Sequence, residues 1–153
     1  MVRHSRLLLL IALTLASLTS LGCGRKESAL NGNWKLDVDK QIAALKEQDM
    51  YKKLPEAARS KMEGEMKKGF DAMMFTFADG KLTLKSTDNK DAKGQEVDYK
   101  VTSKEGDKWQ LETTDKNKKV DQVTITWSGN DNITLTPPKK GAMDIEFFLK
   151  REK

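Results

Sequence analysis

The chain has 153 residues, of which 28 are lysine or arginine and 23 are aspartate or glutamate, and 37% are hydrophobic. This length and composition indicate one compact domain and exclude a protein built of membrane-spanning segments. The only histidine, His4, and the only cysteine, Cys23, both lie within the first 23 residues. The rest of the chain therefore has neither imidazole nor thiol, which excludes most familiar catalytic chemistry.

Residues 1–22 are predicted to be a signal peptide. Arg3 and Arg6 provide a basic start, and an apolar run over residues 7–18 follows it. That run is too short to cross a bilayer as a helix, which needs about 20 residues. We therefore interpret the segment as a leader that is cleaved on export.

The segment Ser20-Leu21-Gly22-Cys23 at the end of this leader resembles the bacterial lipobox. The resemblance implies that Cys23 is lipidated, becomes the first mature residue and anchors the chain to a membrane. Residues 23–31 would then be the lipidated cysteine and the tether that joins it to the domain. Ser20 replaces the usual leucine, as looser versions of the motif allow. Gly24, which is not aspartate, favours the outer membrane of the cell envelope. The alternative is an ordinary cleaved signal in which Cys23 is a spare thiol.

The mature chain carries a nearly balanced charge, because its lysines and arginines are spread over the sequence without a long basic run. This pattern predicts a solvated surface rather than a site for a polyanion. Export also places the protein away from nucleic acid. We therefore expect no nucleic-acid partner.

A strand and two helices are predicted at the start of the mature domain. Trp34, Leu36 and Val38 alternate with charged residues, which is typical of a half-buried strand. Apolar residues then recur at helical spacing, which predicts helices over about 40–50 and 55–72.

From Phe75 onwards the apolar period changes to two, and Asp79-Gly80 predicts a tight hairpin turn. The last predicted strand places Met143, Ile145, Phe147 and Leu149 in one inward row. Short turns between strands predict antiparallel up-and-down pairing, and closure of the sheet would remove its exposed edges. The fold class is therefore mainly β: an eight-stranded antiparallel barrel or strongly curved sheet over residues 32–153, with the two helices inserted after the first strand.

Gly32-Asn33-Trp34 resembles the G-x-W motif that opens the lipocalin and fatty-acid-binding barrels, and the order of elements agrees with those families. The resemblance implies a calycin-type barrel that binds a small hydrophobic ligand or lipid. It also implies that Arg151, or else Lys150, packs across Trp34. Phe147-Phe148-Leu149 stands where fatty-acid-binding proteins carry Arg-x-Tyr, so the clamp for a ligand carboxylate is missing.

An eight-stranded barrel is either filled by its own side chains or holds one small ligand. If a ligand binds, the helices would form a lid and the ligand would enter beside their methionines. The residues predicted to contact it are Met62, Met66, Met73, Phe77, Tyr99, Trp109 and Trp127. The alternative is a structural or interaction lipoprotein with a filled barrel, whose outer surface, including Phe148, meets a protein partner.

We expect no enzyme activity, no cofactor and no metal site. The segment Asp88-Asn89-Lys90-Asp91, with Gly94 and Glu96, superficially resembles a calcium loop, but its spacing fails the EF-hand pattern and lysine interrupts it. Only carboxylate or lysine chemistry would be available to a catalytic site in this chain.

Overall fold

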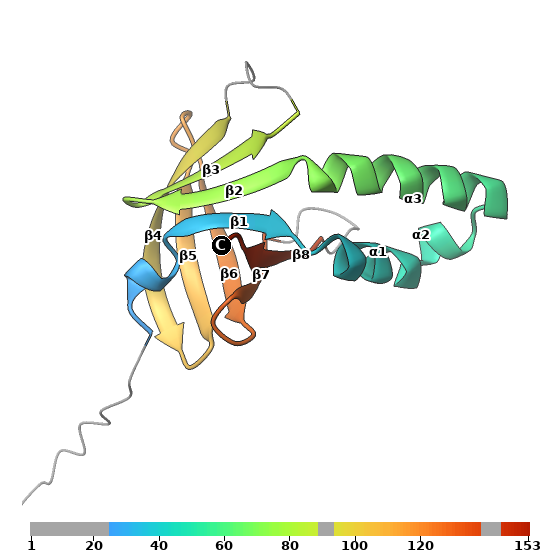
Figure 1. The fold of residues 1–153 in the computed structure, drawn as a ribbon. Helices are drawn as coiled ribbons and strands as arrows, with labels where there is room; N and C mark the ends of the chain where they lie inside the picture. The colour runs from blue at the N-terminus through green and yellow to red at the C-terminus, as the bar shows by residue number, and fades with distance from the viewer. Residues whose placement is uncertain (1–24, 89–93, 139–144) are drawn as a thin grey trace, which may run out of the picture.

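The computed structural model describes residues 25–88, 94–138 and 145–153. It contains a closed antiparallel barrel and a helical arm that extends from one side of it (Figure 1). The predicted signal peptide, Cys23, Met143 and residues 89–93 of the segment that resembles a calcium loop lie outside the described residues. No described helix is long and apolar enough to span a membrane.

The described helices and strands follow the predicted order. The helices are η1 (Glu27–Ala29, a 3-10 turn), α1 (Val38–Glu47), α2 (Asp49–Lys52) and α3 (Glu56–Asp71). The strands are β1 (Gly32–Leu36), β2 (Met73–Ala78), β3 (Lys81–Ser86), β4 (Gln95–Glu105), β5 (Lys108–Thr114), β6 (Val120–Trp127), β7 (Asn132–Thr136) and β8 (Phe147–Arg151). The predicted helix over about 55–72 is confirmed to within a few residues. The predicted helix over about 40–50 is present as two helices, because the extended backbone of Gln48 separates α1 from α2.

The barrel closes between its first and last strands. Each strand pairs with the next, and β1 also pairs antiparallel with β8, so that Trp34 lies opposite Arg151 and Leu36 opposite Leu149. Closure satisfies the backbone groups that an open sheet would leave at its edges. The predicted eight-stranded barrel is confirmed, and the alternative of an open curved sheet is excluded.

Both strands at this closure are shorter than predicted. Val38 belongs to α1, because the Asp37 carboxylate accepts a hydrogen bond from the Lys40 backbone N–H and caps the helix. Ile145 lies before β8 and is 45% exposed, so its predicted inward position is wrong. The reason is that β1 ends before this point and the chain continues into α1, so the Gln41 side chain, instead of a strand backbone, forms hydrogen bonds with the residues around Phe147. Gln41 Nε2 donates to Glu146 O at 2.7 Å, and Gln41 Oε1 accepts from the Phe148 N–H at 3.2 Å.

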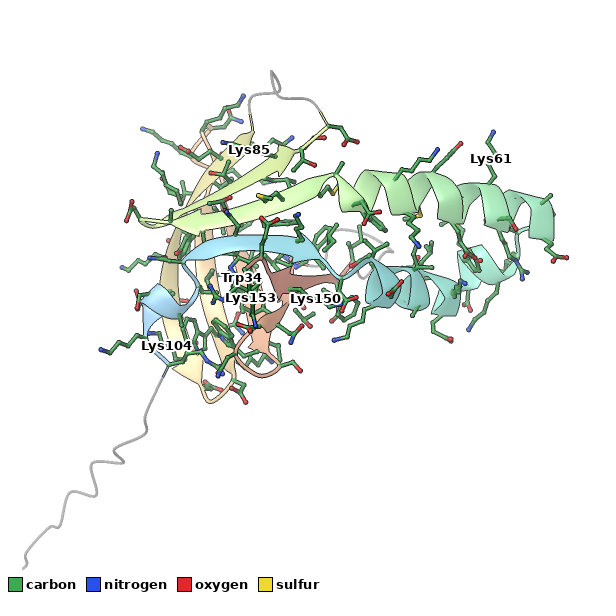
Figure 2. All side chains as sticks on the ribbon, viewed as in Figure 1. Trp34, Lys61, Lys85, Lys104, Lys150 and Lys153 are labelled. Carbon is green, nitrogen blue, oxygen red and sulfur yellow. The ribbon has the colours of Figure 1, made fainter. Side chains whose placement is uncertain are left out.

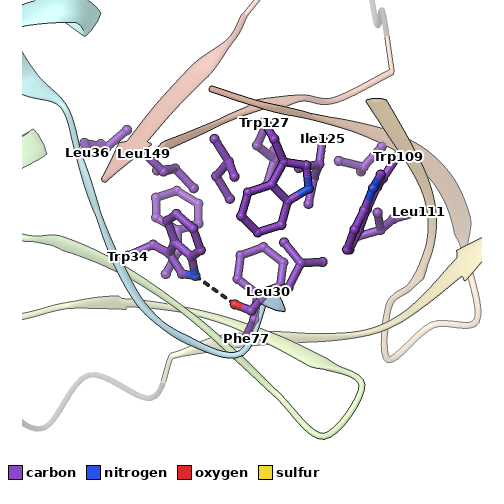
Figure 3. Packing of buried hydrophobic residues seen from close by; sticks show 13 residues of the cluster. Leu30, Trp34, Leu36, Phe77, Trp109, Leu111, Ile125, Trp127 and Leu149 are labelled. Atoms are coloured by element: carbon purple, nitrogen blue, oxygen red, sulfur yellow. Dashed lines mark hydrogen bonds between the residues drawn. The ribbon is translucent and has the colours of Figure 1, made fainter. Parts of the chain in front are cut away.

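Aromatic side chains fill the barrel interior (Figure 3). The Trp127 ring meets the Trp34 ring edge-on at 5.9 Å and the Trp109 ring at 5.3 Å. A cavity large enough for a ligand would leave exposed surface on the side chains lining it. The exposed fractions are 0% for Trp34 and Phe77 and 1% for Trp109. These side chains therefore pack against one another rather than around an open cavity.

Residues 25–31 and the helical arm, which consists of α1–α3, occupy opposite ends of the barrel (Figure 1). Because the strands run up and down, the turns after β2, β4 and β6 lie at the end where β1 begins, and the α1–α3 arm lies at the other end. Residues 25–31 pack at the first end, where Leu30 is fully buried. The tether predicted over residues 23–31 is therefore not free from Arg25 onwards.

We predict that Ile125→Ala lowers the free energy of unfolding by about 2–5 kcal/mol, because it removes a fully buried side chain from a filled core. Ile42→Ala is the matched control, since Ile42 is half-buried on α1 and should cost less than about 1 kcal/mol. Urea unfolding of both variants measures the difference. Equal losses would contradict a tightly packed interior.

Candidate functional site

An apolar groove lies between the arm and the segment that leads into β8. Its volume is about 590 Å³. The apolar side chains lining it come from α1, α3, the start of β8 and the residues just before it, and they are Ala44, Leu45, Met66, Phe70, Ile145 and Phe147. The polar residues lining it are Gln41, Glu47, Gln48 and Glu146.

Helical spacing explains how this groove forms. Gln41, Ala44 and Leu45 lie three and four positions apart, so they share one face of α1. Met66 and Phe70 are four apart and share one face of α3. Neither helix has a fully buried residue, so the faces that meet at the groove keep exposed apolar surface.

Asp37 fixes the direction in which α1 leaves the barrel. Its carboxylate is buried, lies 3.1 Å from Nζ of Lys150 on β8 and 3.8 Å from Nζ of Lys40. Its backbone N–H also donates to Phe148 O at 2.7 Å. The first turn of α1 is thus bound to β8, and one wall of the groove is held against the barrel.

Tyr51 joins the two long helices at the far end of the arm. Its hydroxyl donates to Glu63 Oε1, and Nζ of Lys46 lies 3.0 Å from Glu63 Oε2. The hydrogen bond from Tyr51, followed by that from Lys46, lowers the pKa of the Glu63 carboxyl. The same bond to Glu63 raises the pKa of the Tyr51 hydroxyl. This cluster links α1, α2 and α3 at neutral pH.

The pH dependence of the arm follows from these two shifts. A lowered carboxyl pKa contributes stability above the ordinary value of 4.5 and loses it as the pH falls through the lowered pKa. A raised phenol pKa contributes stability below the ordinary value of 10.0 and loses it as the pH rises through the raised pKa. The contribution of the pair is therefore constant between those two ordinary values.

We predict that Glu63→Gln reduces the stability of the arm at neutral pH and weakens its further loss below pH 4.5. Glu65→Gln is the control, because Glu65 is exposed and its nearest ion-pair distance, to Lys61, is 4.0 Å. Thermal melting followed by the helical circular dichroism signal compares the three proteins. If wild type and Glu63→Gln lose the same stability on acidification, the Tyr51–Glu63 pair does not hold the arm.

The structure separates the residues that the sequence predicts as a ligand site. Met66 lines the groove, whereas Met62 is half-buried on α3 and Met73 packs against the barrel core. Phe77, Trp109 and Trp127 are buried inside the barrel. Tyr99 is half-buried at the opposite end of the barrel from the arm and lines a smaller cavity of about 270 Å³. The seven residues therefore do not converge on one site.

The indole N–H of Trp127 is a buried side-chain donor for which the described residues provide no hydrogen-bond partner. Leaving such a group unpaired costs about 1–3 kcal/mol. The ring is nevertheless packed between Trp34 and Trp109. The unpaired N–H is thus enclosed by the core.

Sequence reasoning missed most of the groove. Gln41 and Gln48 give no signal in the sequence beyond polar positions on an amphipathic helix. Alternation with Phe147 predicts an inward position for Ile145. Phe70 is one of the apolar residues at helical spacing that predict the helix over about 55–72, but such spacing alone does not tell a groove from a core.

The G-x-W region has the geometry that its resemblance implies. The Arg151 guanidinium lies 4.2 Å from the centre of the Trp34 ring, and its Nη1 donates to Asn31 O at 2.8 Å. Gly32 has a φ of +132°, and a Cβ at this position would lie 2.9 Å from Nη1 of Arg151. The backbone angle therefore favours glycine, and a side chain at this position would also displace the Arg151 guanidinium. Lys150 instead contacts Asp37.

Within residues 25–88, 94–138 and 145–153, no three histidine, cysteine, aspartate or glutamate side chains are grouped as metal ligands would be. Comparison of the chain with family models, with curated proteins and with solved structures gives no match. The closed eight-stranded antiparallel barrel is compatible with a calycin-like fold.

Proposed function

We propose that the protein is a non-enzymatic lipoprotein of the bacterial cell envelope that belongs with the calycin-type barrels. It is anchored through a lipid on Cys23 and binds a small hydrophobic molecule or lipid in the groove beneath the arm. The lipobox resemblance of residues 20–23 supports the anchor. The groove itself, with its apolar lining that includes the exposed Ile145, is the observation that carries the binding function.

The groove suits a small ligand better than the barrel interior does. Its volume of about 590 Å³ falls within the range of about 300–1,000 Å³ that is typical of ligand sites. The interior aromatic residues, by contrast, already bury one another. We therefore place the ligand outside the barrel wall. The groove still lies beside Met66, one of the helix methionines where the sequence predicts entry.

The charges around the groove favour a neutral ligand. Glu47 and Glu146 line it, and its described lining includes no lysine or arginine. Binding a free fatty acid here would bring its carboxylate near two carboxylates, with no cation among the described lining residues, which is unfavourable. This agrees with the missing Arg-x-Tyr clamp near the C-terminus. A neutral acyl chain or a similar apolar metabolite meets these conditions.

The second candidate function is a protein-interaction role. The filled core favours it, because a barrel with no internal ligand still offers its outer surface. Phe148 is half-buried rather than either fully covered by the helices or fully exposed. An apolar segment of a partner protein would then occupy the same groove.

We predict that Met66→Asp weakens binding of the neutral apolar probe N-phenyl-1-naphthylamine by at least about tenfold, or about 1.4 kcal/mol, because a carboxylate replaces an apolar wall of the groove. Met50→Asp is the matched control: Met50 is also on the arm and is 64% exposed, but it does not line the groove. Fluorescence titration measures both affinities. Equal binding by the two variants would exclude the groove as the site, and no binding by wild type would favour the protein-interaction role.

The anchor is tested separately. We predict that the wild-type chain expressed in bacteria fractionates with membranes and carries the mass of acyl groups on Cys23, whereas Cys23→Ala appears in the soluble fraction. Fractionation followed by intact mass measurement detects both changes. An unmodified Cys23 in a mature wild-type chain would contradict the lipoprotein assignment.

A further inference from the structure

Arg25 binds two turns at one end of the barrel. Its Nη1 lies 3.1 Å from Oδ1 of Asp107, in the turn between β4 and β5. Its Nη2 donates to Gly129 O at 3.0 Å and to Asn130 Oδ1 at 3.2 Å, in the turn between β6 and β7. The guanidinium also lies 4.3 Å from the centre of the Trp127 ring. Four groups thus surround one side chain at the start of the described chain.

The residues after Arg25 continue this attachment. Glu27 lies 3.3 Å from Nζ of Lys104 near the end of β4. Leu30 is fully buried, and its carbonyl accepts a hydrogen bond from the Trp34 indole at 2.9 Å. Arg151 donates to the carbonyls of Ala29 and Asn31. Residues 25–31, here called the N-terminal segment, therefore form part of the barrel end rather than a linker.

The distance from this barrel end to the proposed lipid is short. Cys23 lies two residues before Arg25 in the sequence. Two residues span at most about 7 Å, even when fully extended. A lipid on Cys23 would therefore bring the turns that contain Asp107 and Gly129 to the level of the phospholipid headgroups.

We propose that the barrel stands on the bilayer in a fixed orientation, with the N-terminal segment and these turns against the headgroups and with the arm pointing away from the membrane. The proposal rests on the lipid anchor at Cys23. It follows from topology as well as from Arg25, because the arm leaves the barrel at the opposite end of β1 (Figure 1). The α3 helix, at 16 residues, is about 24 Å long.

The barrel end suits a zwitterionic phospholipid surface. Its exposed residues carry both signs of charge, with no dominant excess; they include Lys26, Glu27, Asp79, Lys104, Glu105, Asp107 and Lys108. Lys104 lies beside the N-terminal segment, whereas Lys61 lies on the arm far from it (Figure 2). Mixed charges pair with both the phosphate and the ammonium of such headgroups.

This orientation determines from which side the groove is filled. The groove lies with the arm, at the barrel end away from the headgroups. Its ligand or partner then arrives through the aqueous side of the envelope rather than directly from the anchoring bilayer. The protein would accordingly receive a carried or diffusing apolar molecule.

The orientation can be measured with one label at a time. Acylation uses the thiol of Cys23, so an introduced cysteine is the only free thiol in the full-length lipoprotein. A donor fluorophore is placed at Ser128→Cys, in the exposed turn after β6, or at Lys61→Cys, on the exposed face of α3. The purified proteins are inserted into phosphatidylcholine vesicles that carry a headgroup-labelled acceptor. We expect energy transfer from position 128 to be several-fold more efficient than from position 61.

Two further variants test the role of Arg25. Arg25→Ala in each labelled protein should reduce the difference between the two positions, because the residues nearest the anchor then lose their contacts with the two turns. Lys26→Ala is the matched control, since the neighbouring Lys26 is exposed, and it should leave the difference unchanged. Tryptophan fluorescence checks that both variants keep the folded core.

The outcomes separate this proposal from the function on which it rests. If intact mass shows acylated protein but the two positions transfer energy equally, the fixed orientation is overturned and the anchor stands. More efficient transfer from position 61 would reverse the orientation. If mature protein carries no acyl group, the anchor and the orientation are both overturned.

Discussion

The packing around Trp34 is the interaction on which most of this structure depends. The Arg151 guanidinium lies 4.2 Å from the centre of its ring, the Trp127 ring centre lies 5.9 Å away in an edge-on arrangement, and its indole N–H donates to Leu30 O. The cation–π contact contributes about 0.5–2 kcal/mol and the hydrogen bond about 0.5–1.5 kcal/mol. One side chain thus connects the first strand, the last strand, the filled core and the N-terminal segment. The closure of the barrel between β1 and β8 and the attachment of the N-terminal segment both involve this side chain.

Much of the fold could be predicted from the sequence because the alternation of apolar residues is a local property of each strand. A residue such as Ile125 or Leu111 shows its inward direction through its immediate neighbours. Closure also followed from a general argument about exposed edges. The errors occurred at Val38 and Ile145, where the chain leaves the barrel. There, Asp37 and Gln41 form hydrogen bonds with residues about a hundred positions away, and no local pattern reveals such contacts.

The candidate site was harder to predict for a geometric reason. The sequence shows that Trp109 and Trp127 point inward, but whether they fill a barrel or line a cavity depends on how closely they approach, and only the structure supplies the 5.3 Å between their rings. The N-terminal segment is a similar case, because Arg25 and Glu27 have the polar composition of a linker. Their partners are Asp107 and Lys104, far along the chain. Met66 was identified because a helical stripe is again a local signal.

The N-terminal segment is packed and hydrogen-bonded as part of the barrel end, so a lipid on Cys23, as proposed, would be held close to the fold. Amide hydrogen exchange on residues 24–153 tests it most directly. The backbone N–H groups of Ala29, Leu30 and Asn31 donate to carbonyls within the segment at 2.9–3.1 Å. We expect these amides to exchange far more slowly than in an unstructured peptide, and Arg151→Ala to remove much of this protection. Exchange of these amides at the unprotected rate in the wild-type protein would show instead that the segment is a free tether.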